Sequence, residues 1–466
     1  MSSEPHPALA GSKLAIYWSD ASDAPLPSPR LSGMTDADLV VVGGGFSGLW
    51  AAIQALEEQP GRRVTVLEAQ SCGFGASSRN GGFCDASLTH GLENGLSHWP
   101  DEIETLTAFG RANLDQIEAT LEQHGVDASF ERTGELSVAT EEWQLDDLAE
   151  GEEAAAALGY TSRVLDAAEV RRLVNSPTYL GGVNVPEDVA MVDPAKLCWG
   201  LRHIAESLGA TVYEQSRVAG IDRGHHNLVV TSSEGSVRCD KVVVATNAYR
   251  SPVRRARKYT IPIYDHVLVT EPLSTVQMTS IGWEGRQGVG DSASQFHYYR
   301  LTDDNRILWG GYDATYHWNS RIDASLDDRP DTHNKLAHHF FDTFPQLEGI
   351  RFTHRWGGPI ATTTRFTATW GINKERDVSW VGGYTGLGVG ASRFGARVAL
   401  DLVDGLESER TELAMVRKSP LPFPPEPVRS LGVGLTKRAI QRSDRRRGRR
   451  GPWLRLLDRF GVGFDS

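Results

Sequence analysis

Residues 38–48, DLVVVGGGFSG, decide the fold. The unbroken apolar run before the glycines is typical of a buried parallel strand. After the glycines, apolar residues recur at helical spacing, which predicts a helix. The glycines between the two elements fit the pattern G-x-G-x-x-G, which predicts a loop that binds a dinucleotide pyrophosphate. The glycines of the pattern are Gly43, Gly45 and Gly48.

A second apolar strand follows at residues 64–67 and ends in Glu68, twenty residues after Gly48. An acidic side chain at this distance can accept hydrogen bonds from an adenosine ribose. The βαβ unit alone leaves NAD and FAD both open. The dinucleotide contacts that it predicts are Gly43, Gly45, Phe46, Ser47, Gly48, Glu68 and Ala69.

Composition and charge exclude several classes of protein. The chain has 466 residues and a net charge of −12, which disfavours nucleic acid as the main partner. Its four cysteines include no CxxC pair, so we expect no metal site and no disulfide framework. The first residues lack the pattern of a secretory signal, and no apolar stretch is long enough to span a bilayer. We therefore expect a cytoplasmic protein.

Four further stretches carry a family resemblance. They are GFGASSRNGG at residues 73–82, VVVATNAY at 242–249, RWGGPIAT at 355–362 and GGYTGLGVGASRFGAR at 382–397. With the aromatic pair at residues 17 and 18, they resemble the FAD-dependent D-amino-acid oxidase and glycine oxidase superfamily. Within it the chain is most similar to the γ-glutamylputrescine oxidoreductase group.

The resemblance implies FAD as the cofactor and further contacts to it. Residues 77–79 would lie along the pyrophosphate, 80–82 near the isoalloxazine, and Val218 at the adenine. Cys84 follows this run, but relatives that attach flavin covalently use other positions, so we expect non-covalent FAD. The additional contacts are Gly75, Ala76, Ser77, Ser78, Arg79, Asn80, Gly81, Gly82, Val218, Thr246, Asn247, Gly386, Leu387, Gly388 and Val389.

The helix–strand alternation falls into separate blocks with β-rich sequence between them, which predicts an α/β protein that is α+β overall. We expect a Rossmann-type FAD-binding domain with an inserted substrate domain on a mostly antiparallel sheet. Residues 1–36 would be a lead-in rich in Pro and Ser, without a helical or strand period. The predicted ranges are 37–95, 182–255 and 355–412 for the FAD-binding domain, 96–181 and 256–354 for the substrate domain, and 413–466 for a Pro-rich linker and basic tail.

The resemblance also implies the reaction, in which a hydride leaves the carbon next to an amine nitrogen and an imine forms. Glycine oxidase-like relatives hold a substrate carboxylate with an arginine, and that position falls on Ile360 here. Arg300 or Arg365 could replace it, or both could be structural. We therefore favour an amine, or an amine with a distant acidic group, as the small-molecule substrate.

The electron acceptor stays open between oxygen and another acceptor. Sarcosine oxidase-like relatives activate oxygen with a lysine, and the matching stretch at residues 308–312 has none, although Trp309 could stand there. Two other functions also remain open. One is an NAD(P)H-dependent flavin monooxygenase or reductase, and the other is a non-catalytic flavin-binding subunit.

Catalytic candidates lie in the β-rich insert and before the last Gly-rich turn. Strand alternation places His297 and Tyr299 on one face and residues 298 and 300 on the other, and either pair could face the substrate or pack in the sheet. Tyr384 could line the site or pack beside it. The candidates are His297, Tyr299, Arg300 and Tyr384.

The tail from 437 to 459 holds ten basic residues against two aspartates. One interpretation is a helix that binds a membrane surface or a partner. We favour an arm that packs on the acidic remainder of the chain or on a neighbouring subunit of an oligomer.

Overall fold

The computed structural model describes residues 4–225 and 227–462. Two large sheets dominate it, and they confirm the predicted combination of a parallel α/β unit with a mostly antiparallel sheet. The first has six strands. In spatial order they are β10 (Thr211–Tyr213), β4 (Val64–Leu67), β3 (Leu39–Val42), β14 (Lys241–Val244), β22 (Val378–Gly382) and β21 (Thr369–Ile372).

Strand β3 explains why its sequence is apolar at every position. Leu39 and Val41 pack in the core that includes the helices, whereas Val40 and Val42 pack in a second core on the other face. Only β21 runs antiparallel to its neighbour. The helices of the first face are α1 (Phe46–Glu58), α3 (Ile103–Gln123), α6 (Pro194–Ser207) and α9 (Gly388–Asp404). On the other face lies a sheet of β11 (Gly220–Arg223), β12 (Leu228–Thr231), β13 (Gly235–Cys239) and β2 (Gly33–Asp36).

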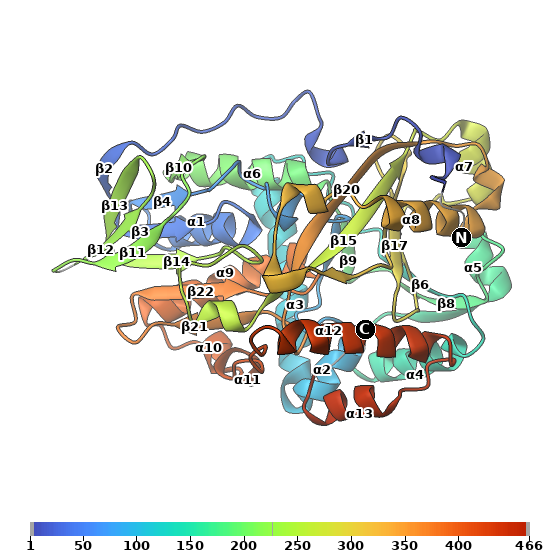
Figure 1. The fold of residues 1–466 in the computed structure, drawn as a ribbon. Helices are drawn as coiled ribbons and strands as arrows, with labels where there is room; N and C mark the ends of the chain where they lie inside the picture. The colour runs from blue at the N-terminus through green and yellow to red at the C-terminus, as the bar shows by residue number, and fades with distance from the viewer. Residues whose placement is uncertain (1–3, 226, 463–466) are drawn as a thin grey trace.

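The second large sheet has ten strands and forms the other half of the molecule (Figure 1). Its two parallel pairings are β1 with β20 and β16 with β6. The order is β1 (Lys13–Leu14), β20 (Phe352–Thr362), β15 (Ile261–Thr270), β18 (Ile307–Gly311), β17 (His297–Leu301), β16 (Gly288–Asp291), β6 (Glu135–Ala139), β8 (Gly181–Val185) and β7 (Arg163–Asp166), with β19 (Thr315–Tyr316) paired to β15.

One face of this sheet packs on α8 (Pro330–Thr343) through a core rich in aromatic side chains, and α5 (Ala167–Leu173) and α7 (Thr275–Ile281) lie at its periphery. Strands β5 (Phe83–Asp85) and β9 (Val189–Met191) pair antiparallel and form a separate two-stranded sheet. Within the described residues, no helix combines the length and apolar character needed to cross a membrane.

Two details differ from the sequence-based expectations. Within the described residues 4–36, the lead-in contains strands β1 and β2, although its sequence shows no strand period. Both are short edge strands that depend on distant partners, β20 and β13, which local sequence cannot reveal. The predicted boundaries at 182 and 355 fall inside β8 and β20, both members of the ten-stranded sheet. The domain division itself stays a prediction.

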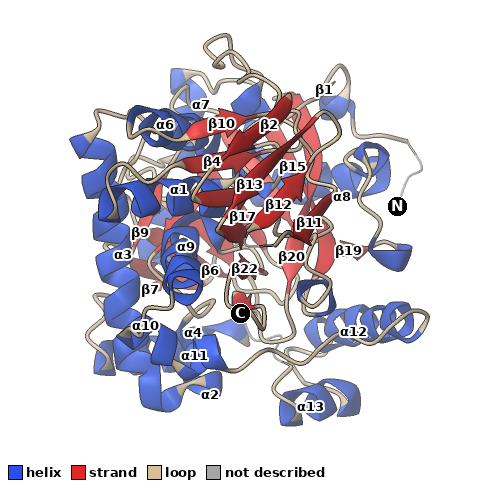
Figure 2. Cartoon of the chain, turned by 90° about the vertical axis from the view of Figure 1, so that its left-hand side faces the viewer, coloured by secondary structure: helices blue, strands red, loops and turns tan. Residues whose placement is uncertain are grey.

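The C-terminal tail folds into helices along one edge of the molecule, and its last four residues lie outside the described part. Figures 1 and 2 show α12 and α13 at this edge, in line with contacts of their connecting loop with Trp143 and of Gly461 with His98. The helices concerned are α10 (Glu409–Glu412), α11 (Ala414–Arg417), α12 (Val428–Asp444) and α13 (Pro452–Arg459), with α2 (Leu92–His98) and α4 (Gln144–Ala157) as neighbours.

Candidate active site

A cavity of about 1500 Å³ runs between the two large sheets. Ordinary small-ligand pockets hold roughly 300–1,000 Å³, so this cavity has room for a dinucleotide and a further small molecule. Its walls come from the glycine loop after β3, the start of α9, one face of the ten-stranded sheet and the C-terminal helices.

The glycine loop is shaped by close backbone contacts. Gly43 has a φ of +114°, and an added Cβ would lie 2.6 Å from the carbonyl oxygen of Ala245. A Cβ on Gly48 would lie 1.8 Å from the carbonyl oxygen of Gly43, which only a displacement of α1 could relieve. These glycines therefore let α1 start directly beside β3, with its first turn at the cavity.

Two helix N-termini open onto the cavity. Gly45 precedes α1 and Leu387 precedes α9, and neither start has a side-chain cap. Free N–H groups and the helix dipole make such ends favourable for anionic groups. Beside the first, Glu68 accepts hydrogen bonds from the backbone N–H groups of Gly44 at 2.7 Å and Gln70 at 2.8 Å. Burial nevertheless raises the pKa of Glu68.

The run at residues 75–82 forms the next part of the wall and is braced internally. The Ser77 hydroxyl accepts a hydrogen bond from the N–H of Phe46 at 3.0 Å. The Asn80 side-chain amide donates to the carbonyl oxygens of Ala76 and Ser77 and accepts from the N–H of Gly82. Arg79 donates to the carbonyl oxygen of Gly357 at 2.7 Å and pairs with Asp327. Arg79 thus ties this run to the ten-stranded sheet.

Tyr384 connects the two helix starts. Its hydroxyl lies 2.7 Å from the Ser47 hydroxyl on α1, and its ring packs against Gly388 and Gly395 of α9. Asn247, whose backbone has a φ of +43°, accepts a hydrogen bond from the N–H of Gly383 at 3.0 Å. These contacts hold the Gly-rich turn before α9 against the first βαβ unit.

Nearly all of the predicted dinucleotide contacts line this cavity. The three that do not are Gly48, Ser78 and Gly82, which lie behind the wall; at Gly48 and Gly82 an added Cβ would meet backbone oxygen. Those that do are Gly43, Gly45, Phe46, Ser47, Glu68, Ala69, Gly75, Ala76, Ser77, Arg79, Asn80, Gly81, Val218, Thr246, Asn247, Gly386, Leu387, Gly388 and Val389.

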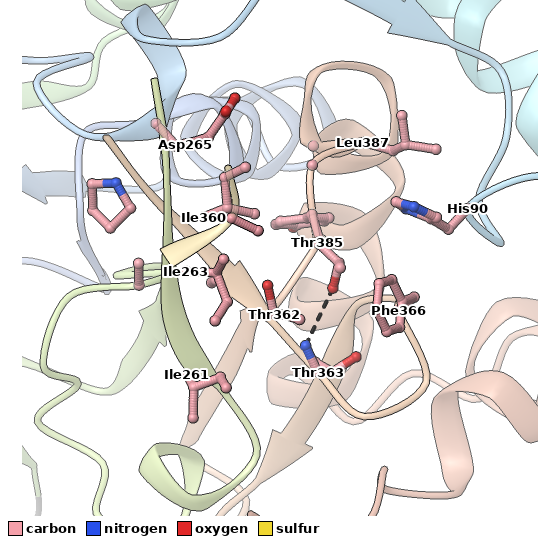
Figure 3. Close-up of a pocket in the computed structure, with 18 of the residues that line it drawn as sticks. His90, Ile261, Ile263, Asp265, Ile360, Thr362, Thr363, Phe366, Thr385 and Leu387 are labelled. Atoms are coloured by element: carbon pink, nitrogen blue, oxygen red, sulfur yellow. Dashed lines mark hydrogen bonds between the residues drawn. The ribbon is translucent and has the colours of Figure 1, made fainter. Parts of the chain in front are cut away.

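The part of the cavity below β15 and β20 is apolar. Ile263 and Ile360 are register partners and face His90, Phe366 and Leu387 across the space (Figure 3). The position at which a carboxylate clamp was considered is therefore an isoleucine that lines the wall. A simple amino-acid carboxylate would find no arginine there.

Arg300 and Arg365 are the two alternatives for that clamp. Both side chains donate hydrogen bonds to backbone carbonyl oxygens instead. Arg300 donates to the carbonyl oxygen of Val192 at 2.7 Å, and Arg365 donates to the carbonyl oxygens of Met415 at 2.7 Å and Ala368 at 3.1 Å. Both side chains are buried and neither lines the cavity.

The polar group on this wall is a carboxylate with a tyrosine. Tyr298 donates a hydrogen bond from its hydroxyl to Asp265 Oδ2 at 2.6 Å, and both residues line the cavity. The Tyr298 ring fits between Gly81 and Gly310, where an added Cβ would lie 2.8 and 2.6 Å from ring atoms. Burial raises the pKa of Asp265, partly offset by the hydrogen bonds that it accepts, and burial also raises the pKa of Tyr298.

Two of the catalytic candidates lie on the opposite face of β17. The Tyr299 hydroxyl lies 2.6 Å from that of Tyr179 inside the α8 core. His297 Nδ1 lies 2.6 Å from Asp291 Oδ2, and its Nε2 lies 3.0 Å from Nδ1 of His339. Neither His297 nor Tyr299 lines the cavity, so the site proposed below does not use them. Trp309 is buried in the same core, whereas the adjacent Gly310 leaves room for Tyr298.

Comparisons with known proteins give the family. A model described as FAD dependent oxidoreductase (DAO) matches residues 38–402, a range that contains both helix starts at the cavity. The chain belongs to this FAD-dependent oxidoreductase family. It is 30% identical over 412 residues to gamma-glutamylputrescine oxidoreductase of Escherichia coli, which covers 88% of this chain and 92% of that protein.

Other relatives agree. The chain is 28% identical to the probable oxidoreductase OrdL of Haemophilus influenzae, over 85% of this chain and 89% of that protein. Among solved structures, glycine oxidase from Geobacillus kaustophilus superposes with a TM-score of 0.66 and 22% identity, over 80% of this chain and 96% of that one. The latter likeness concerns the fold.

FAD is the cofactor of this oxidoreductase, and the cavity fits it. The two uncapped helix N-termini suit the pyrophosphate and the electron-rich pyrimidine edge of a flavin, and Glu68 suits a ribose. Cys84 is buried in the helical core, while Phe83 and Asp85, its neighbours on β5, line the cavity. Strand alternation thus turns the Cys84 thiol away from the flavin site.

Sequence reasoning missed Asp265 and the C-terminal arm, and it left open whether the strand face with Tyr298 meets the substrate. Asp265 and Tyr298 have no motif, although strand alternation had separated Tyr298 from His297. The C-terminal arm supplies a wall through residues that include Phe423, Thr436 and Trp453. Its basic composition predicted packing on acidic surface, and Lys437 does donate to Asp313 at 2.6 Å, but composition could not place the arm at the cavity.

Proposed function

We propose that this FAD-dependent oxidoreductase oxidises the carbon–nitrogen bond of an amine to an imine. When bound, FAD supplies the two-electron oxidation chemistry at the carbon next to nitrogen. Two observations support an amine rather than a simple amino acid. Ile360 stands where a carboxylate clamp was considered, and Asp265 offers a negative group on the same wall. The relative named gamma-glutamylputrescine oxidoreductase is consistent with an amine substrate.

The pairing of Asp265 with Tyr298 carries the proposal. An amine arrives mostly as an ammonium ion and must lose a proton before its carbon can give up a hydride. The Asp265 carboxylate accepts that proton, and the Tyr298 hydroxyl holds Oδ2 in place. Because burial raises its pKa, Asp265 is a stronger base than an exposed aspartate.

Apolar side chains complete the arrangement. Ile263 and Ile360 exclude water from the carbon chain of the amine, and water exclusion strengthens the attraction between ammonium and carboxylate. Tyr384 acts as a positioning residue, since it joins the starts of α1 and α9.

The decisive experiment is anaerobic reduction of the purified holoprotein by a panel of alkylamines, N-methylamines and amino acids, followed by admission of air. We expect amines to bleach the flavin, with a rate that rises as the pH passes upward through the pKa of Asp265. Asp265→Asn should slow flavin reduction by about a hundredfold or more. It should also remove the rise of the rate with pH, which is the ascending limb of the pH profile. A panel in which no amine reduces the flavin, or bleaching by NADH alone, would refute the proposal.

Tyr298→Phe is the matched control. It keeps the carboxylate and removes only the hydroxyl that lowers the Asp265 pKa, so the limb should move to higher pH. Both variants should retain FAD, which is held by other elements. An unchanged pH profile in both would exclude Asp265 as the base.

A further inference from the structure

A second acidic position lies in the same cavity beyond Tyr298. Strand β17 pairs with β16, and β16 with β6, so that Gly290 lies between Tyr298 and the residues of β6. Glu135 is the first residue of β6, and its Oε1 lies 3.4 Å from the place of a Gly290 Cβ. Asp85, at the end of β5, lines the cavity beside it.

The Glu135 carboxyl group has no partner of its own. Protein encloses it on all sides except the cavity, and among residues 4–225 and 227–462 no hydrogen bond or ion pair to its side chain is present. Burial, together with the nearby Asp85, raises the pKa of Glu135 to about 8. Burial also raises the pKa of Asp85, to about 6, although its carboxylate accepts a hydrogen bond from the N–H of Ser87.

Two cations of the C-terminal arm that line the cavity are occupied elsewhere. Lys437 binds Asp313, and Arg429 donates to Ser320 Oγ and to the carbonyl oxygen of Pro424. An enclosed carboxyl group without a partner is costly to ionise, and a cationic ligand removes that cost. Within the described part of the chain, no cationic side chain forms a hydrogen bond or ion pair with Glu135, so a cationic ligand would supply the missing positive charge.

We propose that Glu135, with Asp85 beside it, binds a second cationic nitrogen of the substrate, so that the enzyme prefers diamines and polyamines. This inference rests on the proposed oxidation of an amine and names its substrate class. The reacting nitrogen lies at Asp265 and the second nitrogen at Glu135.

The sheet sets the separation of the two ends. Asp265 lies on β15 and Glu135 on β6, with β18, β17 and β16 between them. Four strand spacings correspond to roughly 19 Å between backbones, less the inward reach of both side chains. A substrate that contacts both carboxylates therefore needs a chain of several methylenes between its nitrogens. Gly290, which places no side chain beside Glu135, leaves this part of the face open to it.

The test compares α,ω-diaminoalkanes of increasing length with n-alkylamines of the same length. Binding to the FAD-loaded protein is measured by calorimetry, and anaerobic flavin reduction is measured in parallel. We expect the longer diamines to bind at least about tenfold more tightly than matched monoamines, a difference of about 1.4 kcal/mol. Glu135→Gln should abolish this preference, because it lowers the affinity for diamines to that for the matched monoamines.

Asp147→Asn is the control. Asp147 is an exposed acidic residue on the rim of the same cavity, so the variant makes the same change of charge without touching the enclosed pair. It should keep the preference for diamines. FAD content and thermal unfolding establish that each variant is folded.

The outcomes separate the inference from the function on which it rests. Equal affinity of the wild type for diamines and monoamines, or equal losses for both in Glu135→Gln, would overturn the diamine site alone. Failure of every amine to reduce the flavin would overturn the amine oxidation instead. Loss of the preference in Asp147→Asn would show that rim charge, rather than Glu135, attracts the second nitrogen.

Discussion

The C-terminal arm forms a wall of the cavity, and Lys437 ties it to the body of the protein. Its Nζ donates to Asp313 Oδ1 at 2.6 Å and to the carbonyl oxygen of Ala314 at 2.8 Å. Lys437→Met should release α12 from the ten-stranded sheet without disturbing the FAD site. We therefore expect a higher KM for the amine, an unchanged FAD content and faster proteolysis of residues 418–427, the Pro-rich linker before α12.

The magnitude follows from the surroundings of Asp313. Removing one member of a buried ion pair costs about 3–5 kcal/mol when the other is left without a partner. Here Thr332 and Lys335 still bind Asp313, at 2.8 and 3.2 Å, and nearly a third of the Lys437 side chain is exposed. The cost should therefore be about 1–2 kcal/mol, which corresponds to roughly a tenfold larger population of the open arm.

The effect should depend on pH with a definite sign. Burial opposes ionisation of Asp313, but Lys437, Thr332 and Lys335 together hold its pKa well below the ordinary value. A lowered pKa contributes stability above the unfolded-state pKa of about 3.9 and loses it as the pH falls toward the folded-state pKa. The difference between wild type and Lys437→Met should thus be full at neutral pH and shrink in acid.

Limited proteolysis at pH 7 and in mild acid, with hydrogen exchange of α12, measures this difference. Arg442→Met is the control because Arg442 is an exposed cation on the same helix, and its side chain forms no ion pair or hydrogen bond within the described residues. Equal cleavage rates for wild type, Lys437→Met and Arg442→Met would refute the assignment of Lys437 as the tie.

Two further predictions concern the cofactor half and the buried arginine. Gly48→Ala should displace α1, because overpacking of this kind costs about 1–3 kcal/mol. In titrations of the apoprotein, FAD binding should weaken by about 10- to 100-fold. The control is Gly434→Ala on α12, where no atom lies within 4 Å of the new Cβ, and this variant should bind FAD normally. Arg300→Met should lower the free energy of unfolding in urea by about 1–3 kcal/mol, because it leaves the Val192 carbonyl unpaired. A rise in KM without loss of stability would instead show that Arg300 binds substrate.

The cofactor half was predictable because its chemistry is local. A strand, a tight glycine turn and a helix must follow one another in sequence, and the acidic residue must end the next strand. Gly43, Gly45 and Glu68 consequently lie at the cavity where the pattern placed them. The central strand β3 was equally visible, since burial on both faces leaves an uninterrupted apolar run.

The substrate half was not predictable, because its contacts depend on which strands become neighbours. Alternation shows that His297 and Tyr298 point to opposite faces but not which face meets the flavin. That choice is made by glycines elsewhere in the chain: Gly310 on β18 and Gly81 after the FAD loop leave space for one ring, and Tyr298 fills it.

The same argument explains why the reactive groups are separable from the cofactor site. Asp265, Tyr298 and Glu135 lie on three different strands of one sheet face, whereas the FAD contacts lie on the parallel unit, its loops and the segments beside it. Substitutions on that face can therefore change which amine is oxidised without changing which cofactor is bound. If Glu135→Gln removed FAD as well as the preference for diamines, the two halves would not be independent, and the assignment of roles by sheet would fail.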